Sequence, residues 1–194
     1  MEIVILRHGK PASVPAGSIA GHEIGRWVAR YNELGINLQL PPPEPVQRLV
    51  TAAGCLLASD LRRSVESAQR FFSQCKIRVD PDLREAALPQ SLGVPIRMPP
   101  GVWVVLARLA WWVNIGGAAE SLAATRRRAS RVAERLCALA AENGAVGVVG
   151  HGMFNRFIAA QLRKRGWQGP VFLPTAYWAV ARFVYAERAV KNDS

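Results

Sequence analysis

The sequence predicts a three-layer α/β/α sandwich with a mostly parallel central sheet. Three short apolar runs have the composition of strands covered on both faces: IVIL at 3–6, CLLAS at 55–59 and AVGVVG at 145–150. Each run ends at polar residues and is followed by a helical pattern. Strands that alternate with helices favour a parallel sheet with helices on both of its faces.

Three helices follow from capping residues and apolar periodicity. Residues 60–72 form one, with Asp60 as its N-cap, and residues 119–143 form the longest, which ends at Gly144. Residues 153–166 form the third, which ends on Gly166. The proline-rich stretches LPPPEP (40–45) and VPIRMPPG (94–101) are expected to be connections. The chain is expected to be one domain, 1–194, with room for a helical lid segment around 89–117.

The charge balance points to oxyanions without fixing which kind. The net charge is +11, carried by 21 arginines and only 4 lysines, and guanidinium presents a fixed fork of donors to such groups. Nucleic acid, acidic membranes and small phosphates all remain open on this ground. The run Arg126–Arg128 points in three directions on a helix, so we expect a solvated face there and no nucleic-acid patch.

The cysteines and the most apolar stretch indicate where in the cell the protein is expected to work. Cys55, Cys75 and Cys137 have no metal-site spacing and are expected to be reduced thiols of a cytoplasmic protein. The most apolar stretch, 101–117, is interrupted by Arg108 and is shorter than the roughly 20 residues of a membrane span. We therefore expect no membrane association.

Cationic residues follow the predicted strands at the point where each one ends. Arg7, His8 and Gly9 follow the first, His151 and Gly152 follow the last, and Arg62 and Arg63 lie just beyond the second. Ligands of open α/β sheets bind beyond the carboxyl ends of the strands, so Arg7, His8, His151 and one of the two later arginines should converge. The glycines should let backbone N–H groups approach the ligand.

Two arginines and two histidines carry too much positive charge to favour a divalent metal, and they suit a phosphoryl group. One histidine can attack phosphorus through a ring nitrogen, while the other cations stabilise the equatorial oxygens. A general acid is still needed for the leaving alcohol.

Four blocks of the chain, in this order, resemble the histidine phosphatase superfamily, which is also called phosphoglycerate mutase-like. They are VILRHGK (4–10), LLASDLRRSVESAQ (56–69), DLREAALP (82–89) and VVGHGMFNRFIA (148–159). The resemblance implies the same three-layer fold. It also implies that His8 is the nucleophile that becomes phosphohistidine, and that Arg7 and His151 bind phosphate.

The other two blocks supply the remaining expected roles. The family arginine lies four residues before a Thr or Ser that is followed by Ala, which selects Arg63, with Ser67 in the Thr position, over Arg62. Glu85 matches the acid/base carboxylate. The glycine and the tryptophan-glutamate-glycine that commonly follow this carboxylate in the family are absent here. Gly152, at the start of a helix, is expected to contribute to phosphate binding.

The predicted activity is hydrolysis of a small phosphorylated metabolite through phosphohistidine at His8, with no metal and no cofactor. The alternatives are a phosphoglycerate mutase-type phosphotransferase, a protein phosphohistidine phosphatase and a non-catalytic binder of phosphorylated ligands. The hypothesis of a nucleic-acid-binding protein rests on the net charge alone and is not favoured. Whether the chain forms a homodimer stays open. No Cys-x5-Arg loop and no P-loop occurs in the sequence. Specificity should come from residues 9–45 and 89–117.

Overall fold

A five-stranded sheet forms the centre of the computed structural model, which describes residues 1–14, 16–71 and 75–185. Its strands run in the order β4 (Lys76–Val79), β3 (Cys55–Ala58), β6 (Ala145–Gly150), β1 (Glu2–Arg7) and β7 (Val180–Val184). Neighbouring strands are parallel, except that β7 runs antiparallel to β1 at the edge. The three strands expected from the sequence are therefore adjacent and parallel, as predicted.

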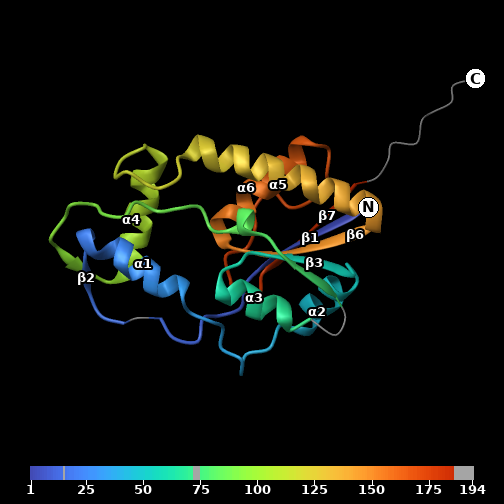
Figure 1. The fold of residues 1–194 in the computed structure, drawn as a ribbon, viewed down its shortest axis with the longest axis horizontal. Coiled ribbons are helices and arrows are strands. Elements are labelled where there is room, and N and C mark those ends of the chain that lie inside the picture. Colours follow the sequence, from blue (N-terminus) through green and yellow to red (C-terminus); the bar gives the residue numbers. More distant parts are fainter. Residues whose placement is uncertain (15, 72–74, 186–194) are drawn as a thin grey trace, which may run out of the picture.

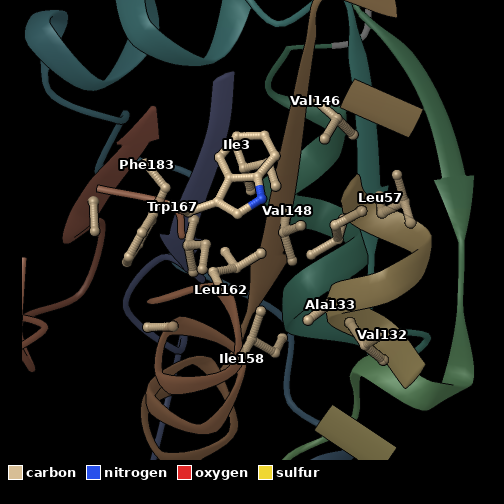
Figure 2. Packing of buried hydrophobic residues seen from close by; sticks show 14 of the residues in the cluster. Ile3, Leu57, Val132, Ala133, Val146, Val148, Ile158, Leu162, Trp167 and Phe183 are labelled. Carbon is tan, nitrogen blue, oxygen red and sulfur yellow. The ribbon is translucent and has the colours of Figure 1, made fainter. Parts of the chain in front are cut away.

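Helices cover both faces of this sheet, which confirms the three-layer prediction (Figure 1). On one face, Ile3 and Ile5 of β1 pack with helices α5 (Leu122–Asn143) and α6 (Gly152–Lys164). On the other face, Val4 and Leu6 pack with α2 (Glu44–Thr51) and α3 (Arg62–Gln69). Figure 2 shows the first of these cores, where side chains of the strands and of α6 point toward one another. Each fully buried Ile or Leu contributes about 1.5–3 kcal/mol, so β1 is anchored from both sides.

Helices α5 and α6 are followed by the predicted glycines, whereas Asp60 does not cap α3. Ser121 caps α5 by accepting a hydrogen bond from the Ala124 N–H at 3.2 Å, and Gly144 ends that helix with φ of 77°. Gly166 follows α6 with φ of 86°. Helix α3 begins at Arg62, because the Asp60 carboxylate forms an ion pair with Arg84 at 2.5 Å instead of capping a helix. Helix α3 ends at Gln69, earlier than predicted, and residue 72, the predicted end, lies outside the described residues.

A second group of elements lies beyond one end of the sheet (Figure 1). It consists of β2 (Ile19–Ala20) paired with β5 (Arg97–Met98), the 3-10 turn η1 (Gly21–Glu23), and helices α1 (Ile24–Asn32) and α4 (Pro100–Trp112). The 3-10 turn η2 (Pro81–Leu83) follows β4.

The proline-rich stretches are only partly connections, which corrects the prediction. Residues 44–45 open α2, residues 97–98 form β5, and Pro100 opens α4. Proline is tolerated in a first helical turn because its missing N–H would have no helical partner there.

Helix α4 is apolar on most of its surface but does not have the length of a membrane span. Trp103 and Trp111 are buried, and their indole N–H groups donate to the carbonyls of Ile19 and Glu120, whereas Trp112 is half exposed. Of the helices in the described part of the chain, none is both long and apolar enough to cross a bilayer.

Candidate active site

The two histidines meet because the register of two strands brings them together. In the β1–β6 ladder Arg7 pairs with Gly150, so His8 and His151 are the next residues on neighbouring parallel strands. Their ring centroids lie 5.1 Å apart, and both side chains are buried. The predicted convergence of the two strand ends is what the structure shows.

The ring of His8 has a defined orientation. Its Nδ1 lies 2.8 Å from the Gly9 carbonyl oxygen. Because a carbonyl only accepts, this contact requires the proton on Nδ1 and leaves the lone pair on Nε2. The Arg63 Nε–H donates to that Nε2 at 3.2 Å. His8 Nε2 therefore faces the cationic group that a phosphate would contact.

Arg63, and not Arg62, reaches the site. The Arg63 side chain is 2% exposed, whereas Arg62 points to solvent and pairs with Glu66 one helical turn away. The Ser67 hydroxyl donates to the Arg63 carbonyl at 2.6 Å and accepts from the Gly9 N–H at 2.8 Å, so it ties α3 to the end of β1. The selection of Arg63 over Arg62, made from its spacing to Ser67, agrees with this geometry.

Arg7 also lines the cleft that holds His8. Its guanidinium lies 4.6 Å from the ring centroid of Tyr177, and its Nη1 donates to the Thr175 carbonyl. Its Nε is buried and has no partner among the described residues. A Cβ at Gly152 would lie 3.6 Å from the Arg7 Cζ, so Gly152 touches Arg7, while its own role in phosphate binding stays a prediction.

Gly9 was expected to let its backbone N–H approach a ligand, but the structure gives another reason for a glycine at this position. Its N–H is taken by Ser67 and does not approach a ligand. A Cβ at Gly9 would lie 2.4 Å from Cζ2 of Trp178, so the missing side chain makes room for that indole.

Glu85 lies in the same cleft and also caps a helix. Its Oε1 accepts from the N–H groups of Phe154 and Ala86, and its Oε2 accepts from the N–H of Met153. Met153 and Phe154 belong to the first turn of α6, where a carboxylate complements the helix dipole. The carboxylate is thereby fixed at the helix that begins beside His151.

Arg128 positions the segment that carries Glu85, which corrects the prediction of a solvated face for this residue. Arg126 and Arg127 are exposed, but the side chain of Arg128 is only 12% exposed. It forms a two-pronged ion pair with Glu120 at 2.7 and 2.8 Å. It also donates to the carbonyls of Asp82 and Arg84, directly before Glu85.

The electrostatics of the site favour neutral histidines and bound anions. Burial, followed by the charges of Arg63 and Arg7, lowers the pKa of His8 to about 3, despite the opposing bond to the Gly9 carbonyl. Burial and the neighbouring His8 and arginines lower the pKa of His151 well below its usual value. Neither ring nitrogen of His151 has a partner among the described residues. A neutral His151 thus has one N–H available for an anion.

Tyrosines from two other segments complete the site. The Arg63 guanidinium lies 4.8 Å from the Tyr31 ring centroid and donates to Asn32 Oδ1 at 3.2 and 3.3 Å. Burial and the nearby Tyr177 raise the pKa of Tyr31 to about 12. The ring of Tyr177 lies 5.7 Å from that of His8. Nothing in the sequence distinguished Tyr31, Asn32 and Tyr177, because no pattern links them to the strand ends that they face.

These residues open into a cleft of ≈ 700 Å³. Residues 9–45 and 89–117 line it as expected, through Val14, Trp27, Val28, Tyr31 and Asn32 from the first and Gln90, Pro100, Gly101, Val104 and Arg108 from the second. The tryptophan in the wall is Trp27, which stacks on Tyr31 at 5.3 Å, and not one of the tryptophans of α4. Across the described ranges, no three His, Cys, Asp or Glu side chains lie close enough together to hold a metal ion.

The model of the histidine phosphatase superfamily (branch 1) matches residues 45–191, which is most of the chain. The chain belongs to the histidine phosphatase superfamily. The match contains Arg63, Glu85 and His151, while Arg7 and His8 precede it and are joined to it by the β1–β6 register.

Several solved phosphatase structures share the fold at low sequence identity. A mycobacterial glucosyl-3-phosphoglycerate phosphatase is 22% identical over 93% of this chain and 88% of its own, with a TM-score of 0.55. Phosphoserine phosphatase of Entamoeba histolytica, in complex with 3-phosphoglyceric acid, is 13% identical over 94% and 90%, with a TM-score of 0.59. The Bombix mori ecdysone phosphate phosphatase with tungstate is 16% identical over 100% and 96%, with a TM-score of 0.56. No curated protein matches the sequence.

Proposed function

We propose that this histidine phosphatase superfamily member is a metal-independent phosphatase that hydrolyses a small phosphomonoester through a phosphohistidine at His8. The observation that carries the proposal is the state of His8. It is a buried, neutral imidazole whose Nδ1 is committed to the Gly9 carbonyl and whose Nε2 faces Arg63. A lone pair held in this way needs no separate base to become a nucleophile.

In the first step the Nε2 lone pair of His8 attacks phosphorus, and the bond from phosphorus to the alcohol oxygen breaks. Arg63 shifts its N–H from Nε2 to a phosphoryl oxygen, while Arg7 and an N–H of His151 hold the other equatorial oxygens. Glu85, when protonated, gives its proton to the departing alkoxide.

In the second step water attacks phosphohistidine and gives a proton to the Glu85 carboxylate. The N–P bond breaks, its electron pair returns to His8 Nε2, and inorganic phosphate leaves. The positive charge that a metal would otherwise supply comes from Arg7 and Arg63, which is why we propose a metal-independent reaction.

The test is hydrolysis of 4-nitrophenyl phosphate in excess EDTA, for wild type, His8→Ala and Arg62→Ala. We expect wild-type turnover that survives the chelator, loss of at least about 10³-fold in His8→Ala, and little change in the exposed Arg62 control. Acid-labile, base-stable ³²P on the wild-type protein during turnover would support phosphohistidine, whereas label that survives acid or is lost in base would indicate another nucleophile. A wild-type protein that binds phosphate but turns over no phosphomonoester would support the non-catalytic binder.

A further inference from the structure

Three side chains that line the cleft have buried nitrogens without a partner among the described residues. In the described part of the chain, the cationic or imidazole side chains with such nitrogens are Arg7 (Nε), His151 (both ring nitrogens) and Arg108 (Nη1). The proposed phosphoryl group would provide partners for the nitrogens of Arg7 and His151. Arg108 comes from α4, lines the same cleft and has no part in the proposed reaction.

Arg108 is held in place but not neutralised. Its Nη2 donates to the Ala86 carbonyl at 3.1 Å, and its guanidinium lies 4.8 Å from the Trp111 ring centroid. No carboxylate within the described ranges forms an ion pair with it at 4.0 Å or less, whereas the largely buried Arg128 has Glu120. Burial lowers the pKa of Arg108, and the more distant Glu85 opposes that change. A guanidinium in this position is stabilised by an anion that enters the cleft.

The rest of the wall near α1 and α4 is mostly apolar, with Trp27, Val28, Leu88 and Val104 in the lining. Arg84 is the other arginine that lines the cleft without a part in the proposed phosphate binding. It already pairs with Asp60 through two hydrogen bonds of 2.5 and 2.7 Å. Arg108 is thus the cationic side chain of this wall that keeps a donor, Nη1, without a partner among the described residues.

We propose that Arg108 binds a second anionic group of the substrate, a carboxylate or a second phosphate, on the alcohol side of the phosphomonoester. The substrate class is then a small phosphomonoester with a short apolar body and an anionic group at its far end. The proposal rests on the proposed function only in placing the first phosphate at His8.

The test is a binding measurement that needs no turnover. Dissociation constants are measured by calorimetry for ω-phosphonocarboxylates with two to six methylenes, for α,ω-bisphosphonates, and for alkylphosphonates of the same lengths. The readout is the affinity ratio of each dianchored ligand to its alkylphosphonate, in wild type, Arg108→Gln, Arg108→Lys and Arg84→Gln.

We expect one chain length to bind about 10- to 100-fold more tightly than its alkylphosphonate in wild type, the value of one charged hydrogen-bonded contact. The gain should vanish in Arg108→Gln, survive in part in Arg108→Lys, and persist in Arg84→Gln. Whether the carboxylates or the bisphosphonates show it identifies the second group.

The proposal is overturned if no length shows a gain in wild type, or if the gain persists in Arg108→Gln. Failure of the phosphatase proposal is separate: a protein with the Arg108-dependent gain that does not hydrolyse 4-nitrophenyl phosphate keeps the second site and loses the reaction. If no phosphonate binds at all, the second site is overturned, and hydrolysis of 4-nitrophenyl phosphate alone decides the phosphatase proposal.

Discussion

Replacing Glu85 by glutamine can distinguish two roles of this residue, the proposed proton donor and the cap of helix α6. The substitution keeps the shape of the side chain and removes only its ionisable group. The carboxylate accepts three backbone N–H bonds, two of them from the first turn of α6. One oxygen of the amide can still accept, whereas its NH2 must face an N–H donor. We expect that mismatch to cost about 1–3 kcal/mol, and the lost charge at the helix N-terminus a further ~0.5 kcal/mol. A protein of ordinary stability stays folded after such a loss.

The effect on catalysis should depend on the leaving group. An alkoxide such as that of n-propyl phosphate needs a proton as the bond to phosphorus breaks, and a general acid contributes about 10²- to 10⁴-fold. The nitrophenolate of 4-nitrophenyl phosphate is a stable anion and needs little help. Glu85→Gln should therefore reduce kcat for n-propyl phosphate by a factor in that range, and for 4-nitrophenyl phosphate by less than about tenfold.

The assay is steady-state release of phosphate from both esters by wild type, Glu85→Gln and Glu142→Gln, a control on the exposed face of α5. Urea unfolding of each variant measures the structural part separately. Equal losses on the two esters would refute the role of Glu85 as general acid and leave it as the cap of α6 alone.

Three further outcomes test the site's construction. Gly9→Ala should destabilise the protein by about 1–3 kcal/mol in urea unfolding, because the new Cβ meets the Trp178 indole at 2.4 Å; unchanged stability would contradict that packing. Arg128→Ala should lower the free energy of unfolding by about 3 kcal/mol because it leaves Glu120 unpaired. The exposed control Arg127→Ala should lower it by less than ~0.5 kcal/mol, and similar losses in the two variants would show that Arg128 does not hold the segment before Glu85 in place. Without phosphate, acid should destabilise the wild type: the pKa of His8 is about 3 when folded and near 6.5 when unfolded, so its stabilisation is complete above pH 6.5 and is lost as the pH falls. Between pH 6.5 and 4.5 this amounts to about 2 kcal/mol, and His8→Ala should show a correspondingly shallower decline; an equal slope in both proteins would contradict a neutral buried His8.

Local sequence was sufficient for the three adjacent strands β3, β6 and β1 and for the residues at their ends, but it did not predict the outer strands β4 and β7. Apolar runs that stop at Arg7-His8 and at His151 placed both histidines at one edge, because parallel neighbours end on the same side. The choice of Arg63 over Arg62 came from the spacing to Ser67 and agrees with the burial of one and the exposure of the other. These features could be predicted because each depends on residues a few positions apart, or on the repeating geometry of strands.

Only the tertiary structure decided the rest of the site. Tyr31, Asn32 and Tyr177 reach the histidines from segments far away in the chain, and no local periodicity marks them. Arg128 looks like one of three equivalent charges in the sequence, yet one helical direction places it against Glu120 and the carbonyls before Glu85. In the sequence Arg108 interrupts an apolar stretch, and in the folded protein its side chain lines the cleft. The sequence by itself thus determined where the strands end and which two histidines follow them. Packing between distant segments decided what surrounds those histidines, because such contacts depend on the whole fold and leave no pattern in the neighbouring residues.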